Sequence, residues 1–343
     1  MALRTKERLQ LIDFEELAYM DTKNFENNSK KPSKLLVSPI SEGSKTKNPI
    51  HLVSIVSGVL ASASWGIGTV MSEGVIQFLP PLTLQVVQLA ASVTVLWGAV
   101  AIQRLSVPLT WKTLRVSLTG FLEPGLTYTL TLVGLKFTTA TRASLIIGAI
   151  EPILITIGAW ILLRERISQT LTVLMGLATT GVVLVLGTRA ITDYSSLAGD
   201  LLIFLGSFCA ALYVVLTRRF VANLSPLVLI ALQHSLGLLW ALGLWFVELL
   251  INGRTTLPSV SLLTWGLAIA SGIVQYALSF WLYLIALRGM QANLASLFLT
   301  LIPVFGVGGA YLFLGERLTM SQWGGAILIL IAVANMSRLK SKN

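Results

Sequence analysis

Long apolar segments alternate with short polar breaks along the chain from Leu52 onward. Most of them are about 17–25 residues long, the length that an α-helix needs to cross about 30 Å of hydrocarbon. The segments are continuously apolar and about twice as long as a membrane β-strand, so the pattern predicts helices rather than a barrel. We read ten spans: 52–72, 82–102, 113–133, 142–163, 170–187, 198–217, 226–251, 262–286, 292–314 and 322–337.

The composition agrees with an all-α polytopic membrane protein. Apolar side chains make up 55% of the 343 residues, charged side chains only 12%, and the mean hydropathy is +0.79. Soluble domains carry about 25% charged residues, so a water-soluble fold could not hide this much apolar surface. The net charge of +10 does not indicate a nucleic-acid partner, because the basic residues are scattered between the apolar runs. A single cysteine, Cys209, excludes an internal disulfide.

Residues 1–50 differ from the rest of the chain, since they hold nine of the 25 Lys/Arg and seven of the 15 Asp/Glu. They contain no apolar core of a signal peptide, and the acidic residues argue against an organellar transit sequence. We interpret this stretch as a flexible cytosolic tail. A short amphipathic helix over residues 9–18, lying on the membrane, is the alternative.

The charges of the loops predict the orientation. With the N-terminus in the cytosol, eleven Lys/Arg outside the tail fall on the cytosolic side and five on the opposite side. An excess of cytosolic Lys/Arg is the rule, so both termini are expected to be cytosolic. We expect a multi-pass protein of a prokaryotic plasma (inner) membrane. The eleven are Arg104, Lys112, Arg115, Arg164, Arg166, Arg218, Arg219, Arg288, Arg338, Lys340 and Lys342, and the five are Lys136, Arg142, Arg189, Arg254 and Arg317.

A motif of the fourth span recurs in the ninth at an offset of 151 residues. It reads Pro152-x5-Gly158-Ala159-Trp160-x2-Leu163-x-Glu165-Arg166 in the first copy and Pro303-x5-Gly309-Ala310-Tyr311-x2-Leu314-x-Glu316-Arg317 in the second. Spans 1–5 are therefore predicted to repeat as spans 6–10. Because five is odd, the second copy enters the membrane upside down, and inverted repeats are typical of secondary transporters. The expected units are a five-helix repeat over 51–188, a second over 189–338 and a cytosolic C-tail, 339–343.

Paired five-helix halves, mid-span prolines in helices 4 and 9 and a Glu-Arg at their ends resemble the drug/metabolite transporter superfamily, more specifically its EamA-type members. The resemblance covers about 52–337. Ala63-Ser64-Trp65-Gly66 also fits, whereas Ala210 stands where the second copy would carry the tryptophan. The family implies export or exchange of amino acids, amines, drugs or other small metabolites. Its cavity is lined mainly by helices 1, 3, 4, 6, 8 and 9, and membership leaves the cargo open.

Polar side chains inside the spans are candidate site residues, because an ionisable group at membrane depth costs about 3 kcal/mol or more. Glu123 lies at the centre of the third span and Glu151 near the centre of the fourth, and Gln275 is the second copy's equivalent of Glu123. A substrate cavity or proton-coupling site is completed by Trp65, Tyr128, Ser144, Tyr276, Asn293 and Thr300. A proline frees a backbone carbonyl and permits a kink. The candidate hinges are Pro124, Pro152 and Pro303.

Each candidate also has a structural interpretation. Small residues on membrane helices often serve close packing, a buried glutamate can be protonated and hydrogen-bonded, and Trp65 and Tyr128 can be core residues. We interpret His234 as structural rather than as a proton relay, because span 7 is expected to be peripheral. The Glu-Arg pairs at the ends of spans 4 and 9 are expected to cap or clamp loops, with a gating contribution left open.

The sequence favours a secondary carrier that moves a small metabolite by alternating access, with protons as a candidate coupling ion. Protease, dithiol, hydrolase and phosphate-loop motifs are absent from it, and two histidines and one cysteine cannot make a usual metal site. We therefore expect no enzyme activity, no cofactor and no metal. A membrane-embedded enzyme or sensor of lipid-like compounds and a passive channel stay as alternatives, and assembly as a homodimer stays open.

The expected cargo is cationic or zwitterionic and carries an amine. In the central spans 1, 3, 4, 6, 8 and 9, no Lys, Arg or His is placed to bind an anion. Burial away from water favours the neutral form of a carboxyl over its charged form. Glu123 and Glu151 are therefore expected either to exchange a proton in the physiological range or to ionise when a cation arrives. Either behaviour would couple transport to pH, by proton antiport in the first case and by competition in the second.

Overall fold

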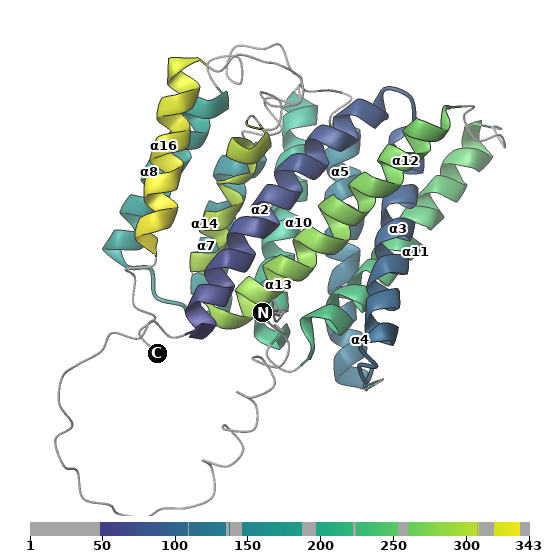
Figure 1. Cartoon of the computed structure of the whole chain (residues 1–343), viewed down its shortest axis with the longest axis horizontal. Coiled ribbons are helices and arrows are strands. Elements are labelled where there is room, and N and C mark those ends of the chain that lie inside the picture. Colours follow the sequence, from purple (N-terminus) through teal and green to yellow (C-terminus); the bar gives the residue numbers. More distant parts are fainter. Residues whose placement is uncertain are drawn as a thin grey trace, which may run out of the picture. The chain divides into compact units, whose positions relative to one another are not determined.

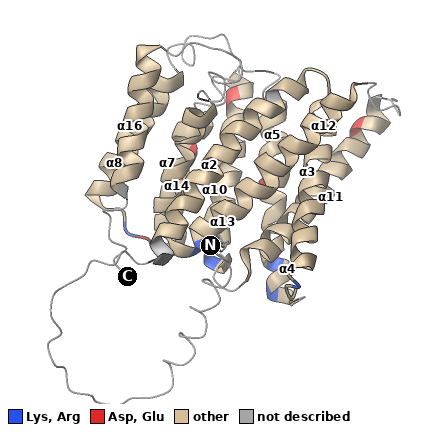
Figure 2. Ribbon diagram, in the orientation of Figure 1, with Lys and Arg blue, Asp and Glu red and all other residues tan. Residues whose placement is uncertain are grey.

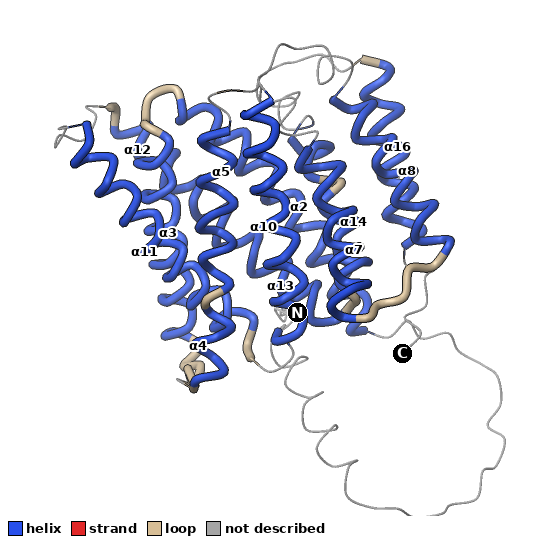
Figure 3. Tube along the Cα trace, turned by 180° about the vertical axis from the view of Figure 1, so that it is seen from behind, coloured by secondary structure: helices blue, strands red, loops and turns tan. Residues whose placement is uncertain are grey.

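The computed structural model describes residues 49–108, 110–134, 137, 146–186, 197–221, 224–252, 260–306, 308 and 319–336, and their regular structure is entirely helical (Figures 1 and 3). Ser144, the C-tail and nearly all of the N-terminal tail lie outside these residues. Within these described residues, seven helices are long and apolar enough to cross a membrane, at the places of the predicted spans 1, 2 and 4 to 8. The chain is a multi-pass membrane protein.

The helices before residue 189 follow the predicted spans closely. They are α2 (Pro49–Ile76), α3 (Pro81–Ile102), the π-helical segment η2 (Ile146–Ile150) continuing into α7 (Glu151–Leu163), and α8 (Gln169–Leu186). The helices after it are α10 (Leu197–Phe220), α11 (Pro226–Asn252), α12 (Leu262–Ser271) continuing through η4 (Gly272–Leu278) into α13 (Ser279–Gly289), α14 (Ala292–Leu299) and α16 (Met320–Met336).

The predicted third span is broken into α4 (Trp111–Ser117), η1 (Phe121–Leu126) and α5 (Thr127–Gly134). Glu123 leaves the helical conformation, with φ −144° and ψ 126°. The ring of the following proline disfavours the α conformation at this position, and Pro124 has no N–H to donate. The Gln85 amide of α3 donates to the carbonyl oxygens of Pro124 at 3.3 Å and Gly125 at 3.4 Å, so the break has partners inside the protein.

The ninth and tenth spans are shorter within the described residues, as apolar helices over Ala292–Gly306 and Met320–Asn335. The ninth turns at Thr300 and Leu301 and is helical again from residue 302, around Pro303. The count of ten membrane helices and their inverted arrangement stay predictions.

Most of the extensive helix contacts join a helix before residue 189 to a helix after it (Figure 1). The pairs are α2 with α13, α3 with α11, α5 with α10, α7 with α14 and α8 with α16. The last pair is packed backbone to backbone at two glycines. A Cβ atom on Gly181 would lie 2.7 Å from the carbonyl oxygen of Gly325 and 2.6 Å from the Ile329 side chain.

Basic side chains gather at one end of the helices, the lower end in Figure 2. These are Arg104, Lys112, Arg115, Arg164, Arg166, Arg218, Arg219 and Arg288, which include every described lysine and arginine. We call this the basic end. All of them belong to the set predicted to be cytosolic.

The glycine contact between α8 and α16 predicts that Gly181→Ala destabilises the protein. The added methyl group must push the helices apart, and overpacking of this kind costs about 1–3 kcal/mol. Gly176→Ala on the same helix is the matched control, because nothing lies within 4 Å of its Cβ position. Thermal unfolding in detergent measures both variants. We expect a lower melting temperature for Gly181→Ala and an unchanged or slightly higher one for Gly176→Ala, and equal values would contradict the close packing.

Candidate functional site

Aromatic rings from five helical segments, all buried except the half-buried Tyr128, meet around Phe280 on α13. Its ring centroid lies 4.9 Å from His234 of α11, 5.0 Å from Trp65 of α2, 6.1 Å from Tyr213 of α10 and 6.5 Å from Tyr128 of α5. Three of these contacts are edge-to-face, an arrangement that aromatic quadrupoles favour. The cluster therefore brings together residues that lie far apart in the sequence.

Two further tyrosines extend this cluster. The ring of Tyr276 on η4 lies 4.6 Å from the ring of Tyr128, and the ring of Tyr283 on α13 lies 5.3 Å from that of Trp65. Both are only 1% exposed. The predicted site residues Trp65, Tyr128 and Tyr276 are thus brought together.

Glu123 and Glu151 adjoin the aromatic cluster. Their side chains are 8% and 9% exposed. The two carboxyls lie within electrostatic range of each other, and both lie within range of Tyr128 and Tyr283. The described lysines and arginines lie in loops or near helix ends rather than in the middle of the spans. We call Glu123, Glu151, Trp65, Tyr128, Tyr276, Phe280 and Tyr283 the acidic aromatic centre.

Several polar atoms beside this centre are buried without a hydrogen-bond partner in the described part of the chain. They include the Tyr283 hydroxyl and His234 Nε2, and the predicted site residue Asn293 has an unpaired Oδ1 at the start of α14. An unpaired buried polar group is costly, so these atoms are available to a ligand or to water. His234 Nδ1 is paired with the Ser92 hydroxyl at 2.7 Å, which orients the ring.

Gln275 and Thr300 make structural hydrogen bonds. Gln275 joins η4 to α2, because its Oε1 accepts from the Ser72 hydroxyl at 2.6 Å and its Nε2 donates to the Thr69 hydroxyl at 3.3 Å. The Thr300 hydroxyl donates to the carbonyl oxygen of Leu297 at 2.7 Å, at the turn after α14. These contacts favour helix packing as the present role of both side chains.

The sequence reasoning did not select Phe280, Tyr213 and Gln233, which the structure places in the interior. Gln233 lies beside the cluster on α11, where its Nε2 donates to the Thr119 hydroxyl at 2.7 Å and the Thr217 hydroxyl at 3.1 Å, and its Oε1 accepts from the Tyr213 hydroxyl at 3.1 Å. A buried amide in an apolar span is a signal that could have found it. Phe280 carries no such signal, because it is one apolar residue among many.

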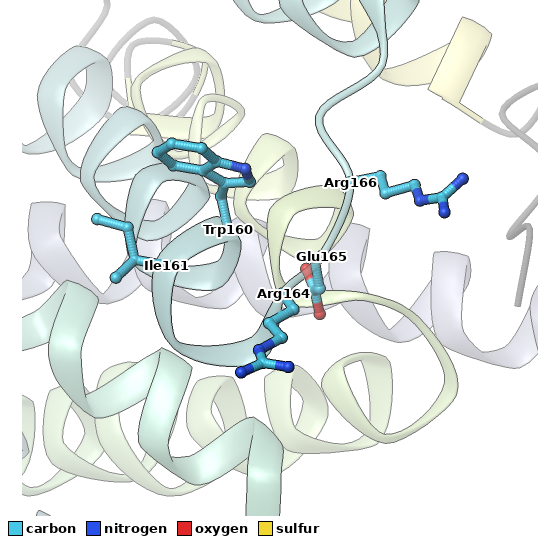
Figure 4. Close-up of a pocket in the computed structure, with 5 residues that line it drawn as sticks. All are labelled: Trp160, Ile161, Arg164, Glu165 and Arg166. Carbon is cyan, nitrogen blue, oxygen red and sulfur yellow. The ribbon is translucent and has the colours of Figure 1, made fainter.

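A separate pocket of about 420 Å³ lies at the basic end of α7 (Figure 4). Trp160, Ile161, Arg164, Glu165 and Arg166 line it, and Glu165 lies between two arginines whose side chains point in different directions. Glu165 is 9% exposed. Its carboxylate accepts hydrogen bonds from the backbone N–H groups of Ala292 at 2.9 Å and Asn293 at 3.0 Å, so it caps the start of α14. We call this contact the Glu165 cap.

Comparison with known proteins agrees with this architecture. The EamA-like transporter family matches residues 52–187 and again residues 197–338. A relative from Bacillus subtilis (strain 168), named "Uncharacterized transporter YyaM", is 30% identical over 208 residues, which cover 60% of this chain and 67% of the relative. A second from the same organism, "Uncharacterized transporter YvbV", is 25% identical over 287 residues, which cover 81% of this chain and 89% of the relative.

More distant proteins extend the same pattern. An Archaeoglobus fulgidus protein named as a transporter is 25% identical over 272 residues, which cover 78% of this chain and 93% of the relative. A solved crystal structure shares the fold at 19% identity, with a TM-score of 0.69 over 85% of this chain and 99% of that chain. The chain belongs to the EamA-like transporter family.

Proposed function

We propose that the protein is a secondary carrier that moves a small amine-bearing metabolite, cationic or zwitterionic, across the plasma membrane. The observation that carries this proposal is the acidic aromatic centre, in which Glu123 and Glu151 lie beside aromatic rings. Carboxylates and the faces of aromatic rings both stabilise a desolvated cation. An anionic cargo would find no complementary charge there, because the described lysines and arginines lie at the basic end of the helices.

The two halves of the chain support alternating access. Glu123 and Gln275 occupy equivalent positions, and each lies in a π-helical segment. Thr127 donates to the Leu122 carbonyl oxygen at 2.9 Å, and its equivalent, Ser279, donates to the Val274 carbonyl oxygen at 2.7 Å. Donor and acceptor are five residues apart in both cases. The backbone differs at the equivalent residues, since Glu123 leaves the helical conformation and η4 continues α12 into α13. The shared hydrogen-bond pattern still supports two related halves that exchange conformations around one site.

Glu151 is our candidate for proton coupling. Burial favours the neutral form of a carboxyl, and the charged or titratable neighbours within electrostatic range of Glu151 include Glu123, Tyr128 and Tyr283. An arriving cation stabilises the carboxylate and drives release of the proton. Glu123 then serves binding more than coupling, because its counterpart Gln275 shows that an amide is tolerated at the equivalent position.

Orientation and location belong to the same proposal. The basic end is the cytosolic end, since excess Lys/Arg marks the cytosolic side of membrane proteins. Both termini then lie in the cytosol, the tail over 1–50 included. Rocking of the helix pairs would use Pro124, Pro152 and Pro303 as hinges.

The orientation predicts which loops react with an impermeant thiol reagent in intact cells. With Cys209 replaced by Ser, single cysteines at Thr192 and Thr255 should be labelled from outside. Cysteines at Gln169 and Asn223 should be labelled only after the cells are opened. Labelling of the second pair in intact cells would reverse the orientation. Labelling of Thr192 and Asn223 from the same side would contradict the inverted arrangement.

The coupling proposal predicts that Glu151→Gln abolishes pH-dependent transport while the protein still inserts and folds, because the amide cannot exchange a proton. Glu123→Gln should weaken substrate binding more than it alters pH dependence. Flux into proteoliposomes with an imposed pH gradient measures this for organic amines, with organic anions as a comparison. Glu248→Gln, near the end of α11, is the matched control and should behave as wild type. Unchanged rate and pH dependence in Glu151→Gln would show that the carboxyl is structural.

A further inference from the structure

We propose that Glu165 is a gating residue, and that the Glu165 cap keeps the cavity closed at the basic end until the transport cycle breaks it. This inference rests on the proposed alternating-access carrier. It assigns the gate to one contact, between the Glu-Arg pair that follows α7 and the start of α14. Glu165 acts by positioning α14 and is not itself placed in the acidic aromatic centre.

The cap is a defined contact from one half of the chain to the other. α7 ends at Leu163, and Arg164 turns the chain with a left-handed conformation, φ 58°. The Glu165 N–H then donates to the Ala159 carbonyl oxygen at 3.2 Å, which fixes the backbone of Glu165 on α7. From there Oε1 accepts from Ala292 and Oε2 from Asn293, so both carboxylate oxygens are used.

α14 depends on this carboxylate. The residue before the helix, Gln291, provides no side-chain cap of its own. The residues of α14 from Ala292 to Leu299 are all buried, so water does not reach the free N–H groups of the first turn. A negative charge at a helix N-terminus also interacts favourably with the helix dipole. The carboxylate therefore holds the start of α14 beside the end of α7, and the Asn293 side-chain amide adds a hydrogen bond to the Arg166 carbonyl oxygen at 3.3 Å.

The cap lies on the way to the acidic aromatic centre. One turn further along α14, the Ser296 hydroxyl meets the Thr156 hydroxyl of α7 at 3.4 Å, so the two helices are also joined beyond the cap. Tyr283 of the acidic aromatic centre lies within electrostatic range of Glu165. Separation of the first turn of α14 from α7 would therefore expose Ser296 and open a route from the basic end towards the centre.

Arg218 provides the alternative partner that a gate requires. It lies near the end of α10, within electrostatic range of Glu165, and its buried Nε has no hydrogen-bond partner in the described residues. When α14 moves away, the Glu165 carboxylate can exchange the two backbone N–H groups for the guanidinium group. The gate then opens by an exchange of partners and does not leave a buried carboxylate without a partner.

The test measures access to Ser296 from the basic end. The full chain carries Ser296→Cys and Cys209→Ser, so that it has one thiol. A small impermeant thiol reagent is added on the side of the basic end in proteoliposomes, and the reaction rate of this thiol is measured. Glu165→Gln should raise the reaction rate about tenfold, because charge-assisted hydrogen bonds are the stronger kind and about 1.4 kcal/mol shifts an equilibrium tenfold. Glu165→Asp keeps the charge on a shorter side chain and should restore part of the closure. Glu248→Gln is the matched control and should leave the rate unchanged.

Arg218→Gln gives the opposite readout. It removes the partner of the open state, so the reaction rate of the same thiol should fall about tenfold and flux should fall with it. A merely structural cap would not give opposite changes in the two variants. If Glu165→Gln is too unstable to purify, Arg218→Gln decides alone.

The outcomes separate the gate from the proposed function. If neither variant changes the reaction rate while wild-type flux is normal, Glu165 is a static cap and the gate is wrong, although the carrier stands. If the wild-type protein moves no amine in proteoliposomes, the proposed function is wrong, whatever reaction rate the thiol has in the variants. A changed rate with the two predicted signs, together with wild-type flux, supports the gate.

Discussion

Hydrocarbon offers no hydrogen-bond partners, so every backbone polar group freed within the membrane must find one inside the protein. Two interruptions of the helices meet this constraint with side chains of other helices. At the break in the third span, the Gln85 amide of α3 donates to the carbonyl oxygens of Pro124 and Gly125. At the start of α14, Glu165 binds two N–H groups. Both interruptions therefore have hydrogen-bond partners inside the protein, as the hydrocarbon requires.

The same constraint makes the two halves depend on each other. α14 is held by Glu165 at its start and by the Ser62 hydroxyl of α2, which donates to the Phe298 carbonyl oxygen at 2.6 Å, near its end. Close approach at glycines reinforces this, since a Cβ on Gly68 of α2 would lie 2.5 Å from the Gln275 side chain. Helices packed this closely move by exchanging one set of contacts for another, because a simple loosening would leave buried polar groups unpaired.

The sequence predicted those features of the fold that depend on a local pattern of residues. The fifth span was expected over 170–187 and α8 covers Gln169–Leu186, since apolarity and length alone define a membrane helix. The irregular backbone at Glu123 follows from the proline after it. A local pattern could not predict which side chains of different helices contact one another. Phe280 is an ordinary apolar residue in the sequence, and its contacts with Trp65, Tyr213 and His234 appear only in the fold. The Glu-Arg pair after α7 was predicted to cap or clamp a loop, but its partner, the start of α14, could not be named from the sequence.

The arrangement of carboxyls links the centre to its closure. Tyr283 lies within electrostatic range of Glu123, Glu151 and Glu165, and its hydroxyl has no hydrogen-bond partner in the described residues. A phenol in this position can donate to a bound cargo or to a carboxylate, depending on which is charged and near. The charges at the centre and on Glu165 therefore both act on Tyr283, a side chain within electrostatic range of all three carboxyls. In the proposed carrier, Tyr283 of the second half would link cargo binding and proton release at the centre to closure by Glu165 of the first half.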